Sequence, residues 1–336
     1  MPDAEIALPG GLDSALVAAL PARHDALLRS AFDVHVHGQP DVDAGRQLRG
    51  DDLQTVRLAQ AYGLSGWVLK SHLWITTDRA RLLQEAAGPD FTIFGSVTLN
   101  PVMGGLSAAV VELASAHGAR VVFLPTWGAA ADVARDGYIA RLLAAASPSF
   151  RGYASVSAIS LLAADGRLSG AATAVIDACR ERGLSLATGH ASLAESRAVA
   201  EYCAHTGQRL LITHPLHYAA DVADLAVFAE LGAYVEFCNG PLLHPDGRES
   251  IRGIHEAIGA VGADHVVLTT DAFSRWAPPQ PECLRMFAEQ LAYLGCSPAE
   301  LHRMLAVNPR AFLGLAAEPA TEPATTPATN PAREES

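Results

Sequence analysis

The chain has 336 residues, of which half are hydrophobic and 18% are charged. This balance supports a large buried core and excludes a wholly disordered chain. The formal net charge is −12 and the sequence contains no basic run, which argues against nucleic acid or an anionic membrane as a partner. No stretch approaches the roughly 18 consecutive apolar residues of a membrane-spanning helix.

The cysteines and the two chain ends set the expected compartment and domain limits. Five cysteines without a CxxC pair predict neither a disulfide framework nor a cysteine zinc site, so we expect a reducing cytoplasm. The first residues lack the basic start and apolar core of a signal peptide. We expect a helical segment over 1–30, one domain over 31–316, and a disordered Pro-, Thr- and Ala-rich tail over 317–336.

Eight short apolar runs follow one another through the domain. Most are continuous rather than alternating, which is typical of parallel strands that are covered on both faces. Ala- and Leu-rich segments with helical spacing separate them, and several end in Gly, as helix C-termini prefer. The runs span 31–37, 66–72, 91–99, 119–127, 184–190, 209–215, 233–239 and 265–271.

Strand followed by helix, eight times over, predicts a (β/α)8 TIM barrel. The alternative is a doubly wound open sheet. The step from the fourth run to the fifth is long enough for an insertion of about 35 residues, beyond the usual length of a connecting helix. The sequence ADG within it predicts a hairpin turn, and the insertion could form a flap.

Polar side chains gather where these strands end. In a barrel of this kind the C-terminal strand ends converge on the active site. The strand-end residues that we single out are His35, His37, Lys70, His72, Asn100, Trp127, His190, His214, Asn239 and Asp271.

Four of these histidines and the aspartate predict a metal centre. His35 and His37 are two residues apart, so their side chains point to the same face of one strand. A single HxH is a weak signal, because an isolated histidine is more often a core residue. Together with His190, His214 and Asp271 at other strand ends, the set indicates a divalent metal, most readily Zn²⁺, with Mn²⁺ or Fe²⁺ as alternatives.

The DVHVH of the first strand, the histidines that close strands five and six, and the TTDA of strand eight resemble the amidohydrolase superfamily of metal-dependent hydrolases. The segment LHRMLAVNPRAFLGL resembles the terminal helix that is common there. The resemblance spans about residues 30–315 and points to an uncharacterised branch with a VLKSH segment on strand two. It implies that His35, His37 and Asp271 hold a buried metal and that His190 and His214 hold a second, more exposed one.

The ligand that would bridge two such metals departs from the pattern of the superfamily. Many members supply it from strand four as a carboxylated Lys or a Glu, and strand four here has neither. Lys70 on strand two is the candidate, as a carbamate formed with CO₂; the alternative is a cation that binds a substrate carboxylate. For Glu236 on strand seven we expect packing or support of a histidine rather than metal ligation.

The remaining polar residues at this end are candidates for substrate binding. His72, Asn100, Trp127, Asn239 and Arg275 form this set, and Arg275 could anchor a carboxylate. His217 and His244 lie on loops after strands six and seven, where they could contact substrate. They are at least as readily explained as ordinary surface histidines. Trp74, Trp127 and Trp276 could wall an apolar pocket or simply pack.

The resulting prediction is a hydrolase that uses a metal-activated water to cleave a carbonyl-type bond of a small molecule: a cyclic amide, amide, lactone or ester. Asp271 would be the catalytic residue, accepting a proton from the water and returning it to the leaving group. Phosphoesters are less favoured, because no Arg cluster or Gly-rich phosphate loop lies near the strand ends.

Two other functions stay open. One is a deaminase, or a decarboxylase or other lyase, with a single metal and an unmodified Lys70. The other is a catalytically silent, metal-stabilised binding protein that would tolerate loss of Asp271. A dinucleotide-dependent dehydrogenase is disfavoured, because no GxGxxG follows the first strand. As for partners, we expect a small-molecule substrate and a homo-oligomer, without nucleic acid or membrane.

Overall fold

The computed structural model describes residues 26–42, 50–218, 220–244, 247, 249–274 and 276–316. Within them, eight strands pair in parallel and in chain order, from β1 beside β2 through to β8. This confirms the predicted (β/α)8 barrel, although seven of the eight strands end before their apolar runs do and only β1 ends with its run, at His37. The strands are β1 (Phe32–His37), β2 (Gly66–Lys70), β3 (Thr92–Thr98), β4 (Ala119–Phe123), β5 (Ser185–Ala187), β6 (Leu210–Ile212), β7 (Tyr234–Cys238) and β8 (Val266–Thr269).

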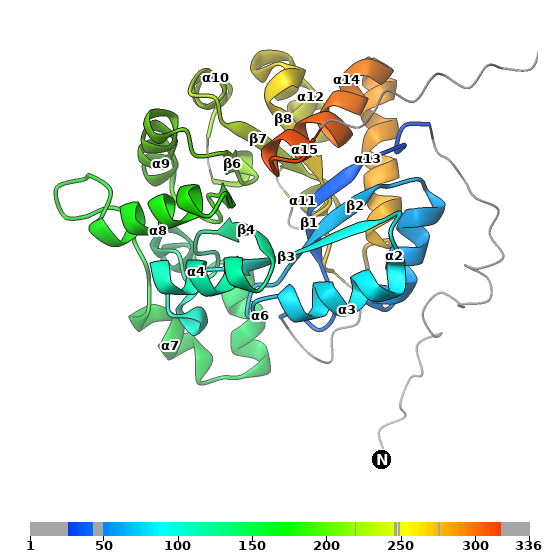
Figure 1. The fold of residues 1–336 in the computed structure, drawn as a ribbon. Helices are drawn as coiled ribbons and strands as arrows, with labels where there is room; N and C mark the ends of the chain where they lie inside the picture. Colours follow the sequence, from blue (N-terminus) through cyan, green and yellow to red (C-terminus); the bar gives the residue numbers. More distant parts are fainter. Residues whose placement is uncertain are drawn as a thin grey trace, which may run out of the picture.

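Helices surround these strands on the outside (Figure 1). They bury Ala, Val, Leu and Ile against the outward-facing strand residues, which forms the largest apolar core of the molecule. The helices that connect successive strands are α2 (Asp52–Ala61), α3 (Thr77–Ala87), α4 (Ala108–Ala116), α8 (Gly170–Glu181), α9 (Leu193–Thr206), α10 (Val222–Glu230) and α12 (Ile251–Val261). After β8 the chain forms α13 (Gln280–Leu294), α14 (Pro298–His302), a π-helical segment (Arg303–Val307) and α15 (Asn308–Phe312).

A bulge in β1 aims the two histidines of the HxH pair into the barrel. Against β2, the chain of β1 advances three residues, from Asp33 to Val36, while β2 advances two, from Trp67 to Leu69. Phe32 and Val34 face the barrel interior, so regular alternation would turn His35 outward; the extra residue turns it inward instead. The Asp33 carboxylate accepts the His35 amide at 3.0 Å, which occupies a backbone donor at the bulge.

The barrel closes between β8 and β1 through individual hydrogen bonds. The Asp271 amide donates to the carbonyl of His35 at 3.0 Å, and the Thr270 hydroxyl donates to Asp33 Oδ2 at 2.6 Å. These bonds hold the end of β8 against the end of β1, so that the first and last predicted metal ligands become neighbours.

The opposite end of the barrel is filled by apolar side chains. Phe312 and Leu313, from α15 and the residue after it, are fully buried against Phe32, Val121 and other inward-facing strand residues. Their carbonyls accept hydrogen bonds from two arginines: Arg209 Nε to Phe312 O and Arg120 Nε to Leu313 O, each at 2.8 Å. The guanidinium groups thus satisfy carbonyls at a helix C-terminus, where cations are favoured.

The insertion between β4 and β5 is confirmed, and it contains three short helices: α5 (Ala130–Ala134), α6 (Tyr138–Ala146) and α7 (Phe150–Val156). The predicted turn at ADG is present, where the Ala163 amide donates to Arg167 O at 2.8 Å beside an antiparallel bridge. Further short helices follow the C-terminal ends of β3, β6 and β7 (Pro101–Met103, Pro215–Tyr218 and α11, Gly240–Leu243), and a 3₁₀ turn (Ala263–His265) precedes β8.

Two predicted segments lie outside the described residues: most of the N-terminal helical segment, before residue 26, and the tail over 317–336. Among the helices that are described, none combines the length and the apolarity needed to cross a membrane.

Candidate metal centre

The barrel brings the predicted strand-end ligands together around one carboxylate. Asp271 Oδ1 lies 3.1 Å from His35 Nε2 and 3.0 Å from His37 Nε2. Its other oxygen, Oδ2, lies 3.7 Å from His214 Nε2. The ring of His190 lies next, with its centroid 5.3 Å from that of His214. Asp271 therefore faces His35 and His37 of β1 with one carboxylate oxygen and His214, which follows β6, with the other.

A second layer of carboxylates holds these rings through their Nδ1 atoms. His35 Nδ1 lies 2.9 Å from Glu236 Oε1, His37 Nδ1 lies 2.6 Å from Asp41 Oδ2, and His190 Nδ1 lies 3.4 Å from Asp132 Oδ1. A carboxylate at Nδ1 favours the tautomer that carries its proton there, which leaves the Nε2 lone pair available to a cation. Glu236 thus contacts a histidine ring, as expected for a residue that supports a histidine.

Asp41 serves two histidines at once. Besides His37, its Oδ2 contacts His72 Nδ1 at 2.9 Å, while Oδ1 accepts the His72 amide and the Ser71 hydroxyl, each at 2.8 Å. The rings of His37 and His72 stack in parallel, with centroids 4.4 Å apart. His72 therefore presents its Nε2 edge beside the metal cluster, fixed by the same carboxylate that fixes His37.

The backbone at the strand ends is strained where it presents these ligands. His214 and Asp271 have φ angles of 26° and 44°, in a left-handed region that residues with a side chain rarely adopt. Two glycines let the neighbouring backbone approach: a Cβ at Gly240 would lie 2.3 Å from Asp271 O, and one at Gly189 would lie 2.3 Å from Leu124 O. Gly189, itself at φ +59°, directly precedes His190.

Lys70 lies at the floor of the cluster. Its Nζ is 2.8 Å from His35 Nε2 and 4.9 Å from the centre of the Phe123 ring, and the side chain is fully buried. Burial lowers the pKa of Lys70, against the opposing effect of Asp271 and Glu236. Phe123 is the last residue of β4, so this strand ends beside Lys70 with an aromatic ring.

Burial sets the charge of the other groups. It lowers the pKa of His190, and that of His214 well below its ordinary value, which favours neutral imidazoles as metal ligands require. Burial alone would raise the pKa of Asp271, but His35 and His37 hold it well below its usual range. Asp271 is thus an anion at neutral pH.

The donor set fits a divalent cation. The ligand atoms of His35, His37 and Asp271 lie within 4.8 Å of one another, and all three side chains are buried. Imidazole nitrogens and a carboxylate oxygen are the ligands that Zn²⁺ and its neighbours in the series take. His214, with Asp271 Oδ2 and His190, offers donors of the same kind on the cavity side.

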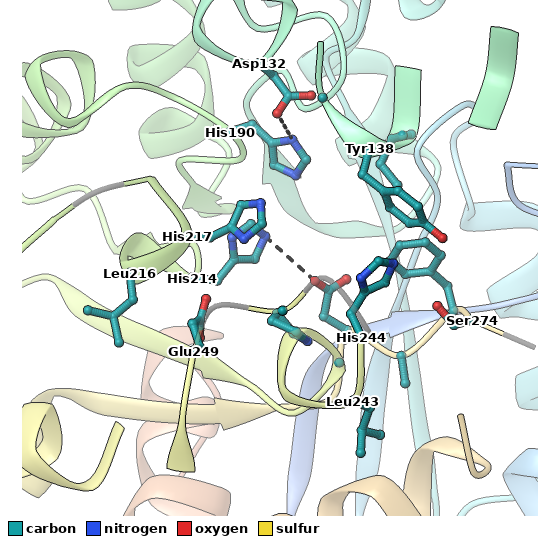
Figure 2. Close-up of a pocket in the computed structure, with 18 of the residues that line it drawn as sticks. Asp132, Tyr138, His190, His214, Leu216, His217, Leu243, His244, Glu249 and Ser274 are labelled. Atoms are coloured by element: carbon teal, nitrogen blue, oxygen red, sulfur yellow. Dashed lines mark ion pairs between the residues drawn. The ribbon is translucent and has the colours of Figure 1, made fainter. Parts of the chain in front are cut away.

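The cluster opens into a cavity of about 780 Å³ (Figure 2). His72, His190, His214 and Asp271 lie in its wall. In Figure 2, Asp132 and Tyr138 from the insertion stand on one side of the histidines, with Glu249 on the other. Aromatic rings line it next to the cluster: Tyr138, His244, Phe273 and Trp276. This volume suits a small molecule.

Three of the residues that we predicted to bind substrate do not line this cavity. Trp127 Nε1 and Asn100 Nδ2 both donate to the carbonyl of His72, at 2.9 and 2.8 Å, so they support His72 from behind. Asn239 is buried between the end of β7 and the start of α11. His72, His217, His244 and Trp276 do line it, Trp74 does not, and Arg275 lies outside the described residues.

Three carboxylates of the site were missed by the sequence reasoning. Asp41 and Glu249 lie on loops, and Asp132 lies in the inserted helix α5, so no strand pattern marks them. Of the three, only Asp41 could have been suspected from the sequence, because it follows His37 by four residues in the loop after β1. Asp132 meets His190 only in the folded chain, because the two residues are 58 positions apart.

Solved structures share this fold. They include an amidohydrolase from Pseudomonas aeruginosa (13% identity, TM-score 0.54, 88% of this chain and 100% of that one). The probable dipeptidase PvdM from the same species matches similarly (13%, 0.55, 87% and 96%). A mutant of the organophosphorus hydrolase from Deinococcus radiodurans does too (15%, 0.53, 91% and 99%). At such identities the likeness establishes the fold alone, a (β/α)8 barrel.

A family profile extends the comparison from fold to sequence. Residues 30–236, more than half of the chain, match the family of unknown function DUF6282, and the chain belongs to this family. The match runs from β1 into β7 and therefore includes His35, His37, Lys70, His190 and His214, whereas Asp271 lies beyond it. No curated protein matches the chain in sequence.

Proposed function

We propose that the protein is a metal-dependent hydrolase that cleaves a carbonyl-type bond of a small molecule with water: a cyclic amide, amide, lactone or ester. One observation carries the proposal. Histidines whose Nδ1 atoms are held by Glu236, Asp41 and Asp132 converge on Asp271, at the mouth of a barrel that opens into a cavity. The names of the fold neighbours, an amidohydrolase, a probable dipeptidase and an organophosphorus hydrolase, agree with such chemistry.

His35, His37 and Asp271 would hold the buried cation, most readily Zn²⁺, with Mn²⁺ or Fe²⁺ as alternatives. When bound, such a cation acts as a Lewis acid on a carbonyl oxygen and lowers the pKa of water to about 7. The protein's own residues orient the reactants and move the proton. Asp271 Oδ2 faces the cavity side, where it would accept a proton from the attacking water and return it to the leaving group.

His190 and His214 would hold a second cation on the cavity side, with Lys70 as the group between the two sites. We propose that Lys70 is carboxylated: its neutral amine attacks CO₂, a proton is released, and a carbamate anion forms. An ammonium ion 2.8 Å from His35 Nε2 would instead lie beside a bound cation, at a high cost in free energy. Labelled bicarbonate and carbon NMR would detect the carbamate, and a Lys70→Ala variant would lose the signal.

A mononuclear deaminase or decarboxylase is the second candidate. The ligand atoms of His35, His37 and Asp271 lie within 4.8 Å of one another. Among the described residues, His190 and His214 belong to no group of three ligands that meets this distance. One metal per chain, with Lys70 unmodified, would favour this candidate.

The test begins with elemental analysis of protein purified without chelator, followed by removal of the metal and reconstitution with Zn²⁺, Mn²⁺ or Fe²⁺. A panel of lactones, esters, lactams, amides and phosphotriesters is then assayed. We expect bound transition metal and a hydrolytic activity that chelation abolishes and metal restores. Protein without bound metal, in which added metal produces no activity, would contradict the proposal.

A further inference from the structure

Glu249 is a half-buried carboxylate in the cavity, and the proposed chemistry does not use it. It lies between α11 and α12, and it lines the same cavity as His190, His214 and Asp271. In Figure 2 its carboxylate points toward the side of the cavity where His214 and His217 stand. It belongs to none of the potential metal-binding groups found among the described residues.

One oxygen of this carboxylate accepts no hydrogen bond from the residues that the structure describes. Glu249 Oε1 is inaccessible to solvent and has no hydrogen-bond donor among the described groups. A buried acceptor without a donor costs free energy on the order of 1–3 kcal/mol. Burial, followed by the charge of Asp271, raises the pKa of Glu249 to about 7, so the ionised form, which only accepts hydrogen bonds, predominates above that pH. The protein thus keeps an unfavourable group beside its reaction centre, which is typical of a functional site.

The bond types open to the proposed hydrolase differ in what they offer such an acceptor. The leaving atom of an ester or a lactone is an oxygen without a hydrogen, whereas a primary or secondary amide carries an N–H donor there. A site that is built to receive a hydrogen bond rejects an analogue that lacks the donor, because its own polar group stays unpaired.

We infer, on the basis of the proposed hydrolase function, that Glu249 binds the amide N–H of the substrate and so selects lactams or amides over lactones and esters. The acceptor lies on the opposite side of the histidines from Asp132 and Tyr138. A substrate whose carbonyl lies at His214 and Asp271 would keep its leaving nitrogen within the cavity that Glu249 also lines. The arrangement makes Glu249 a specificity-determining residue, separate from the metal ligands.

The test measures binding by NMR titration of the metal-loaded full chain with three matched probes: δ-valerolactam, N-methyl-δ-valerolactam and δ-valerolactone. Only the first carries an N–H donor. We expect the wild type to bind it about tenfold more tightly than the other two, the ratio that about 1.4 kcal/mol produces. In Glu249→Leu the three affinities should converge while metal content stays unchanged. Glu249→Ala gives the same comparison if the leucine variant does not fold.

Glu256→Leu is the matched control, since Glu256 lines the cavity from α12 but is exposed; its preference should equal that of the wild type. An equal affinity of the wild type for all three probes overturns the inference, and so does a preference that survives in Glu249→Leu. Loss of metal in that variant would make Glu249 a ligand instead. If the preference depends on Glu249 but the protein has no hydrolytic activity, the hydrolase proposal is contradicted and the binding role of Glu249 stands.

Discussion

The two ends of the barrel interior are filled by side chains of opposite character, apolar at one end and ionisable at the other. At the N-terminal end the interior is filled by Phe32, Val34 and Val121, and Phe312 and Leu313 close it. At the C-terminal end the inward positions hold His35, Lys70, Glu236 and Asp271, all buried. Apolar packing at the N-terminal end stabilises the fold. Burial of ionisable groups at the C-terminal end costs desolvation free energy, which is typical of a functional site.

This contrast leads to a general expectation. Substitutions at the N-terminal end should change the free energy of unfolding and leave metal binding intact, because they lie among apolar side chains. Substitutions at the C-terminal end should do the reverse. The predictions below test this separation, beginning with the largest effect.

Asp271→Asn should abolish activity. It removes the carboxylate that faces His35, His37 and His214, together with the proton acceptor, and general acid–base catalysis alone contributes about 10²–10⁴-fold. We expect at least a thousandfold loss of kcat/KM on the substrate found in the panel, with reduced metal content by elemental analysis. Asp136→Asn, at the cavity rim, is the control and should keep its activity. Full turnover by Asp271→Asn would remove it from catalysis and favour the silent binding protein.

Phe32→Ala should destabilise the molecule by about 3–5 kcal/mol, the usual cost of emptying a fully buried aromatic site. Chemical denaturation measures the change, and metal content per folded chain should stay the same. Leu82→Ala, at a position that is 68% exposed, should change little. Loss of metal in folded Phe32→Ala protein would show that the two ends are coupled.

Asp41→Asn should weaken metal binding about 10–100-fold, because it releases the Nδ1 atoms of both His37 and His72. Competition against a chromophoric chelator measures the affinity. Asp52→Asn provides the comparison, since the Asp52 carboxylate supports the Gln39 amide and no histidine. If both variants bind metal equally well, the Asp41 carboxylate does not determine the metal affinity of the site.

Glu249 should make stability depend on pH. Its pKa is raised from 4.5 to about 7, so the folded protein binds more protons than the unfolded chain between these values. Its contribution is therefore fully present below pH 4.5 and is lost as the pH rises through about 7. Each unit of pKa shift corresponds to at most about 1.4 kcal/mol. Denaturation of metal-free protein should show the wild type losing stability relative to Glu249→Gln over this range; parallel curves would place the carboxylate in solvent.

Arg209→Met should cost about 1 kcal/mol, the net value of hydrogen bonds lost to the carbonyls of Phe312 and Gly183. Arg197→Met is the matched control, since its ion pair with Asp224 lies at the surface and such pairs contribute little. Thermal and chemical unfolding should separate the two variants. Equal effects would show that Arg209 does not secure the closure of the barrel.

The sequence predicted the barrel because parallel strands covered on both faces are continuous apolar runs, and all eight runs contain a strand. It also located His35, His37, His190, His214 and Asp271, since strand ends of such a barrel meet at one mouth. It assigned Asn100 and Trp127 to substrate, whereas their side chains bind the carbonyl of His72. A strand-end position fixes the height of a residue in the barrel, but not the direction in which its side chain points.

By itself, the order of residues determined the architecture and the identity of the clustered imidazoles, because periodicity and strand ends are local properties of a chain. Only the tertiary structure decided which carboxylates stand behind His35, His37 and His190, how a bulge turns His35 inward, and that Glu249 lines the cavity with an oxygen that has no hydrogen-bond donor among the described residues. Those outcomes depend on loops and an insertion whose contacts join residues far apart in sequence, and no local pattern encodes such contacts.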